Sequence, residues 1–254
     1  MKKENKLFNK LKALLNKVWD FLYPDNLECI FCSAEINENR ELACCEKCLD
    51  EYFKGRKVCA KCGDKITSKT NYCLACKKEI CLEYEFARAP FVYEGNAKKL
   101  VFNLKYNNGK WLAKYMAEFM KNEFEEMAVE VDAIIPIPLH NKRLIERGYN
   151  QSELLANELS KKIAIPAILN NLVKTKETTT QTKLTKAERQ ENLKGCFEIT
   201  NKSEIAGKNI LLIDDVFTTG ATIEEASKVL KNAGANKIYI LTFAHTPRPI
   251  KFEK

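Results

Sequence analysis

The chain has 254 residues, 45% of them hydrophobic, with only 9 Gly and 7 Pro, which excludes a collagen-like or disordered protein. Its formal net charge is +8, but binding of two zinc ions by eight thiolates would reduce this to about +4. Such modest basicity does not by itself argue for nucleic-acid binding. No run approaches the roughly 20 apolar residues that a membrane-spanning helix needs.

The first 25 residues form a predicted amphipathic helix that ends near Pro24. Its lysines interrupt the apolar stretch that a signal peptide requires, so we expect a cytoplasmic protein whose thiols stay reduced. The helix either packs against its own protein, which is the favoured reading, or contacts a partner or the inner face of the membrane. The apolar positions that predict it are Leu7, Leu11, Leu14, Leu15, Val18 and Leu22.

Residues 26–82 hold ten of the 11 cysteines and few apolar runs, so this segment needs a metal to fold. Four Cys-x-x-Cys pairs can each supply two ligands, and two pairs complete a tetrahedral zinc site with no position left for water. We therefore predict a double zinc ribbon with two structural zinc ions. Sequential pairing is the simplest assignment and an interleaved one stays open. The predicted ligands are Cys29, Cys32, Cys45, Cys48, Cys59, Cys62, Cys73 and Cys76.

Residues 83–254 alternate apolar runs with helical patterns, which predicts an α/β domain with a mostly parallel sheet flanked by helices. The expected strands cover residues 89–93, 131–137, 210–213 and 237–243, and the expected helices cover 111–127, 147–162 and 221–233.

The run at residues 210–213 ends in Asp214 and Asp215, and residues 216–222 then turn into a helix. Open α/β sheets bind ligands at the carboxyl ends of their strands, and a Thr- and Gly-rich turn at a helix N-terminus suits a phosphate. The two carboxylates suit sugar hydroxyls, so the pattern predicts a sugar-phosphate site. A magnesium-binding strand of a P-loop ATPase would need a Gly-x-x-x-x-Gly-Lys loop upstream, which this chain lacks.

Residues 211–222 resemble the phosphoribosyl pyrophosphate motif of type I phosphoribosyltransferases. Residues 134–140 and 147–151, together with Thr178, Gln181, Leu184 and the following residues to Phe197, are similar to the ComF family of late-competence proteins, which also has an N-terminal double zinc ribbon. The resemblance implies the type I phosphoribosyltransferase fold and a magnesium ion that accompanies the pyrophosphate.

By this resemblance Asp214 and Asp215 would hold the ribose hydroxyls, and Arg147 would be the best-placed pyrophosphate ligand. Lys142 and Arg143 are candidates for the same role, although surface cations are usually solvated. Where relatives often carry arginines before Thr178, this chain has lysines, which lack the bidentate fork. The residues implied to wrap the 5′-phosphate are Thr218, Thr219, Gly220, Ala221 and Thr222.

The resemblance implies a role in DNA uptake, with single-stranded DNA or competence proteins as partners. Two functions stay open: a phosphoribosyl-pyrophosphate-binding protein without transfer chemistry, and an active transferase that displaces pyrophosphate with a nucleobase or amine acceptor. Residues 178–192 would be either a loop that closes over the site or a plain surface connection. Phe31, Tyr52, Phe53 and Tyr72 are candidates for base stacking, although a role in the core of the ribbons is favoured.

Overall fold

The computed structural model describes residues 28–36, 42–49, 57–66, 70–78, 82–177 and 193–247. The chain divides into two compact units, residues 1–50 and 51–254. The division lies inside the segment predicted as a double zinc ribbon, so the two halves of that segment belong to different units. The predicted N-terminal helix lies outside the described residues.

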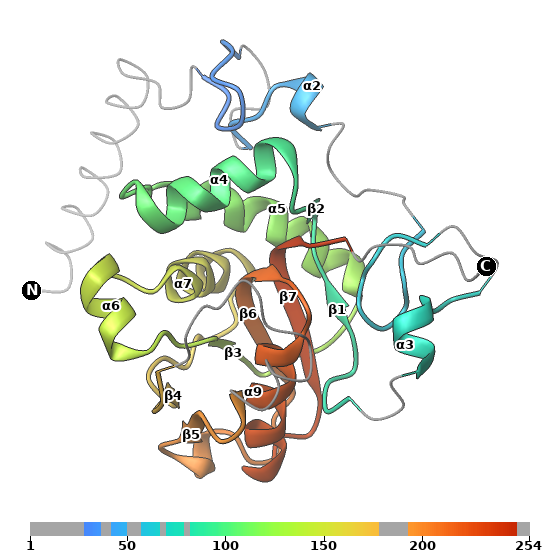
Figure 1. The fold of residues 1–254 in the computed structure, drawn as a ribbon, viewed down its shortest axis with the longest axis vertical. Coiled ribbons are helices and arrows are strands. Elements are labelled where there is room, and N and C mark those ends of the chain that lie inside the picture. Colours follow the sequence, from blue (N-terminus) through green and yellow to red (C-terminus); the bar gives the residue numbers. More distant parts are fainter. Residues whose placement is uncertain are drawn as a thin grey trace, which may run out of the picture. The chain divides into compact units, whose positions relative to one another are not determined.

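A parallel sheet forms the centre of the second unit (Figure 1). Its strand order is β1-β7-β6-β3, and β2 also pairs with β7; every described pairing in this sheet is parallel. This confirms the predicted parallel α/β architecture. The strands are β1 (Ala87–Arg88), β2 (Phe91–Val92), β3 (Ala133–Pro136), β6 (Ile210–Phe217) and β7 (Ile238–His245).

Helices cover both faces of this sheet because its buried strands are apolar on both sides. Ile210 and Leu212 of β6 join Leu230 of α9 (Ala221–Asn232) in one core cluster. On the other face α5 (Leu112–Met127) and α7 (Gln151–Ile163) pack against the sheet and against each other. The successive residues of each strand therefore belong to two different cores.

The sequence patterns placed most helices within a few residues, with two differences. The helix expected over residues 147–162 is α7, which begins only at Gln151, and it is preceded by a short helix that was not predicted, α6 (Asn141–Arg147), which ends because Gly148 adopts φ 77°. That left-handed conformation ends a helix and favours glycine. Helix α4 (Gly95–Tyr106) was not predicted. A small antiparallel pair, β4 (Leu172–Lys174) and β5 (Phe197–Ile199), also lay outside the prediction.

The two zinc-ribbon halves repeat one local structure. An isolated antiparallel bridge joins Glu28 to Glu35 in the first half, and one joins Val58 to Lys65 in the second. Each bridge encloses a Cys-x-x-Cys turn, and each is followed by a short helix, α2 (Glu46–Leu49) or α3 (Leu74–Lys78). The repeat accounts for the regular spacing of the cysteine pairs.

Candidate functional site

The acidic pair lies inside strand β6, not after it as expected, because β6 continues to pair with β7 as far as Phe217 and His245. Oδ1 of Asp214 accepts hydrogen bonds from Ser152 Oγ and from the backbone N–H of Asp215, both at 2.9 Å. Ser152 lies at the start of α7, so a helix of the covering layer fixes the orientation of this carboxylate.

The second carboxylate is neutralised from a different helix. Asp215 is buried, and its Oδ2 forms an ion pair with the ammonium of Lys105, near the end of α4. Burial alone would lower the pKa of Lys105, but the negative charge of Asp215 outweighs it and raises that pKa. The lysine therefore stays charged, and the buried pair is electrically balanced.

Asp214 has no cation of its own at hydrogen-bonding distance among the described contacts. Burial, and then the negative charge of Asp215, raise its pKa to about 7. The two adjacent carboxylates thus differ in their partners: Asp215 forms an ion pair with Lys105, whereas Asp214 accepts hydrogen bonds from Ser152 and the Asp215 N–H and has a raised pKa. Such perturbed carboxylates at the carboxyl end of a parallel strand are typical of a ligand site.

The turn after β6 has the geometry of an anion site. Gly220 adopts φ 83° and is the N-cap of α9, and the backbone N–H of Ala221 lies 3.4 Å from Thr219 Oγ1. A Cβ on Gly220 would lie 2.9 Å from Cζ of Phe217, whose ring stacks on His245 at 5.3 Å. Glycine suits this position best, and the N-terminus of α9, the positive end of its dipole, follows Asp214 and Asp215 closely along the chain.

The predicted cationic residues lie on the short helix α6. Its N-cap is His140, whose Nδ1 lies 3.4 Å from the backbone N of Lys142. Arg143 and Arg147 are half-buried and line a cavity of about 570 Å³ together with Lys105. Lys142 is exposed and pairs with Glu177 at 3.1 Å. The fold thus brings the two arginines, but not Lys142, to a cavity shared with the lysine that binds Asp215.

Two site residues were missed from the sequence. Lys105 precedes Asp215 by 110 residues, and no local pattern marks it. Ser152 had no visible role before the position of α7 was known. Lys174 of β4 is half-buried: burial lowers its pKa, while the negative charge of Asp214 raises it. Lys174 therefore lies within electrostatic range of the acidic pair.

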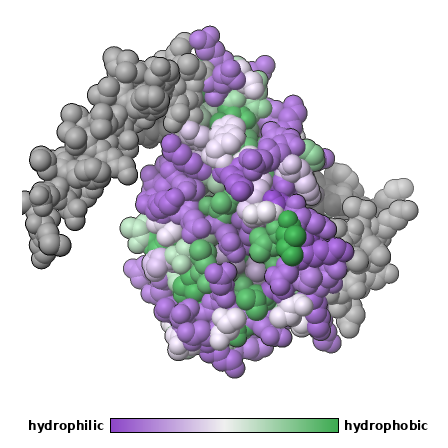
Figure 2. All heavy atoms as spheres, turned by 90° about the vertical axis from the view of Figure 1, so that its left-hand side faces the viewer, coloured by the Kyte–Doolittle hydropathy of each residue, from purple (hydrophilic) through white to green (hydrophobic). Residues whose placement is uncertain are grey.

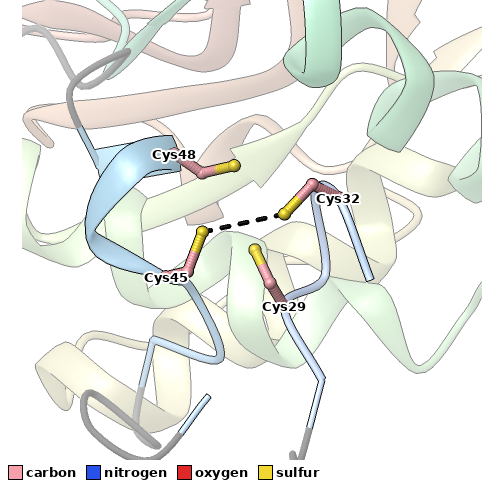
Figure 3. Close-up of side chains that lie close together, drawn as sticks. All are labelled: Cys29, Cys32, Cys45 and Cys48. Atoms are coloured by element: carbon pink, nitrogen blue, oxygen red, sulfur yellow. Dashed lines mark hydrogen bonds between the residues drawn. The ribbon is translucent and has the colours of Figure 1, made fainter. Parts of the chain in front are cut away.

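Both predicted cysteine clusters form, and each unites two consecutive Cys-x-x-Cys pairs. Figure 3 shows the first of them, formed by Cys29, Cys32, Cys45 and Cys48. All sulfur atoms of a cluster lie within 4.8 Å of one another. The Sγ–Sγ distances Cys32–Cys45 and Cys62–Cys73 are both 3.7 Å, and a tetrahedron with zinc–sulfur bonds of about 2.3 Å requires about 3.8 Å. The residues therefore fit two structural zinc ions, and the sequential pairing is the one the fold adopts. Cys44 donates to the carbonyl of Cys45 and is not a member.

The second cluster belongs to the core of the second unit. Cys59 and Cys62 share one apolar cluster with Ala87 of β1. The backbone N–H of Ala87 donates to the carbonyl of Lys61 at 2.7 Å, and Arg88 Nη1 lies 3.3 Å from the carbonyl of Ala60. This Cys-x-x-Cys turn thus adjoins the edge of the sheet, so a zinc ion held by the second cluster would stabilise the domain that carries the acidic pair.

Comparisons with known proteins agree with this arrangement. The phosphoribosyl transferase domain family matches residues 106–253, and the double zinc ribbon domain matches residues 18–77. Competence protein F of Haemophilus influenzae is 31% identical over 227 residues, which are 85% of this chain and 95% of that protein. This chain belongs to the ComF family.

Two further relatives extend the comparison for this ComF-family protein. Competence protein ComFC of Bacillus subtilis is 28% identical over 198 residues, 70% of this chain and 79% of that protein. DNA utilization protein YhgH of Escherichia coli K12 is 32% identical over 115 residues, 45% of this chain and 50% of that protein. The chain is therefore a competence-related, phosphoribosyltransferase-like protein with the type I phosphoribosyltransferase fold. In the part of the chain that the structure describes, no helix is both long and apolar enough to cross a bilayer.

Proposed function

We propose that this protein binds phosphoribosyl pyrophosphate with magnesium at the end of strand β6. Asp214 and Asp215 would accept hydrogen bonds from the ribose hydroxyls, and residues 218–222 would surround the 5′-phosphate. Arg143 and Arg147 would bind the pyrophosphate, for which Lys142 is a weaker candidate because it is exposed and paired with Glu177.

The observation that carries the proposal is the junction of β6 with α9. A carboxylate pair, half-buried at Asp214 and buried at Asp215, and a helix N-terminus capped by Gly220 at φ 83° meet within seven residues of chain. A sugar phosphate is the ligand class that needs both, because its hydroxyls donate hydrogen bonds to carboxylates and its phosphate accepts them from backbone N–H groups. A free phosphate would be repelled by the carboxylates, and a neutral sugar would leave the helix N-terminus unused.

In this proposal Lys105 reduces the net negative charge of the carboxylate pair Asp214 and Asp215. Because its charge balances Asp215, only one net negative charge remains near the ribose when Asp214 is ionised. That limits repulsion of a ligand that carries several negative charges. Magnesium, when bound with the pyrophosphate, would neutralise part of that ligand charge.

Titration calorimetry with phosphoribosyl pyrophosphate and magnesium tests the proposal. Asp214→Asn keeps an oxygen that can accept from Ser152 and from Asp215 N–H but removes the negative charge, so we expect at least tenfold weaker binding. Asp132→Asn is the matched control, since Asp132 binds the backbone N of Asn209 at the other end of β6. It should bind as the wild type does. Absence of binding by wild-type protein would refute the proposal.

The same samples distinguish binding from transfer. Release of pyrophosphate on addition of a nucleobase would identify an active phosphoribosyltransferase; tight binding without release would identify a ligand-binding protein. We propose the second, with a role in DNA uptake inside the cell, which is supported by the similarity to competence protein F of Haemophilus influenzae and competence protein ComFC of Bacillus subtilis. His140 caps α6, and its Nδ1 faces the backbone N of Lys142, which favours a structural role for it over that of a general base.

A further inference from the structure

Three aromatic side chains, two on α4 and one at the start of α5, are unusually exposed. Phe102, Tyr106 and Trp111 are 52%, 64% and 61% exposed, whereas the aliphatic residues of α4 are buried in the domain core. Exposed large aromatics that cluster in sequence indicate a binding surface, because single exposed apolar residues are common but groups of them are not.

The charged residues of the segment that carries these rings have one sign, although Glu146 of α6 lines the cavity beside Tyr106. Residues 95–117 contain five lysines and no Asp or Glu. One of them, Lys105, is used by Asp215, and the other four are exposed. We define the aromatic–lysine surface as Lys98, Lys99, Phe102, Tyr106, Lys110, Trp111 and Lys114.

Helix geometry arranges these residues into a row. Lys98, Phe102 and Tyr106 follow one another at intervals of four along α4, which places them on one face of the helix. The Phe102 and Tyr106 ring centroids lie 4.9 Å apart, and the Arg147 guanidinium lies 5.2 Å from the Tyr106 ring. Trp111 follows a short turn and contacts Tyr115 edge-on at 6.1 Å. The rings are thus supported from one side and open on the other.

The setting of the surface favours an extended anionic partner. Tyr106 also lines the 570 Å³ cavity that contains Arg143 and Arg147, so the row of rings runs up to the candidate site. The face of the molecule on which α4 and α6 lie is largely hydrophilic, with separate hydrophobic patches in place of one continuous apolar layer (Figure 2). A lipid surface would require a broader apolar face than this one.

We propose that the aromatic–lysine surface binds single-stranded DNA, with bases stacked on Phe102, Tyr106 and Trp111 and phosphates near the lysines. Exposed rings interleaved with cations are what an unpaired strand needs, because each base has a face that can stack. A duplex keeps its base faces covered. The proposal rests on the proposed DNA-uptake role for its biological context, but not on the phosphoribosyl pyrophosphate site.

The fluorescence of Trp111 provides a direct measurement. Trp19 is the other tryptophan of the chain, so a Trp19→Phe variant leaves Trp111 as the sole reporter. Titration with oligothymidylate should quench this fluorescence to saturation. In parallel, anisotropy of a labelled oligonucleotide should show about tenfold weaker binding for each of Phe102→Ala and Trp111→Ala.

Salt dependence tests the lysines. Replacing Lys98, Lys99 and Lys114 by Gln should reduce the slope of log K against log salt by about 2, since each phosphate contact on a single strand contributes about 0.7. The matched control replaces three exposed lysines outside the aromatic–lysine surface by Gln and should leave the slope unchanged. These control residues are Lys202, Lys228 and Lys237.

Four results would overturn the proposal: no oligonucleotide binding by wild-type protein, binding that Phe102→Ala and Trp111→Ala leave intact, loss of binding on Tyr72→Ala alone, or binding to anionic phosphatidylglycerol vesicles in place of DNA. Tyr72, 48% exposed, is the comparable aromatic residue in the ribbon segment. Calorimetry with phosphoribosyl pyrophosphate separates this proposal from the previous one. Phe102→Ala and Trp111→Ala should keep that binding, whereas Asp214→Asn should lose it and keep oligonucleotide binding.

Discussion

Replacement of Asp214 by Asn should stabilise the protein at neutral and alkaline pH. The folded-state pKa of Asp214 is about 7, whereas an unperturbed aspartate has a pKa near 3.8. The folded protein therefore binds a proton that the unfolded chain has released throughout this interval, so stability falls as pH rises from about 4 to about 7. At 1.36 kcal/mol for each pKa unit, ionising Asp214 in the fold costs about 4 kcal/mol above pH 7.

The Asn variant does not titrate and keeps an oxygen acceptor for Ser152 and the Asp215 N–H. We therefore expect the difference in unfolding free energy between variant and wild type to grow by about 2 kcal/mol from about pH 5.5 to about pH 7.5. Urea unfolding followed by circular dichroism measures it. Loss of zinc at low pH affects both proteins and cancels in the difference. A difference that is constant with pH, or that shrinks as pH rises, would refute the reasoning. A variant that is more stable and yet binds no ligand would show that this carboxylate serves function at the expense of stability.

Three more substitutions probe the same framework. Lys105→Met should lower the unfolding free energy by about 3 kcal/mol, because it leaves Asp215 buried without its cation, and adding Asp215→Asn should recover part of that loss in the same urea assay. Gly220→Ala should cost about 1–2 kcal/mol, seen as a lower midpoint of thermal unfolding, since φ 83° strains any L-residue; an unchanged midpoint would contradict the geometry. Cys62→Ser should make the second unit sensitive to proteolysis, whereas Cys32→Ser should not; equal sensitivity would disprove that only one cluster lies in its core.

Sequence patterns were sufficient to predict the features that depend on residues close together in the chain. The strand at residues 210–213 is recognisable because a continuous apolar run suits a strand covered on both faces, and the cysteine ligands are recognisable because a Cys-x-x-Cys turn places two sulfur atoms on one ion. The sequential grouping of the cysteine pairs was the simplest prediction, and the structure decides for it against the interleaved alternative. Membership of the ComF family followed from motifs, and the comparisons confirm it.

The features that were missed depend on distant contacts. Strand β6 extends past its apolar run to Phe217 because β7 supplies hydrogen-bonding partners up to His245. Helix α4 was overlooked because its exposed positions include Phe102 and Tyr106, which blur the alternation of apolar and polar faces. The role of Lys105 depends on the position that this same helix gives it opposite Asp215 of β6. The length of β6 and the role of Lys105 therefore become apparent only when the complete fold is known.

The position of the second cysteine cluster in the core of the second unit determines where a stable fragment of this protein can begin. A fragment that starts at residue 83 would leave the backbone N–H of Ala87 without the carbonyl of Lys61 and would uncover the apolar residues that pack on Cys59 and Cys62. A fragment that starts at residue 51 keeps these contacts and one complete set of four thiolates. A recombinant fragment of the second unit should therefore begin there and be produced in zinc-supplemented medium, because zinc bound by this cluster would stabilise its core.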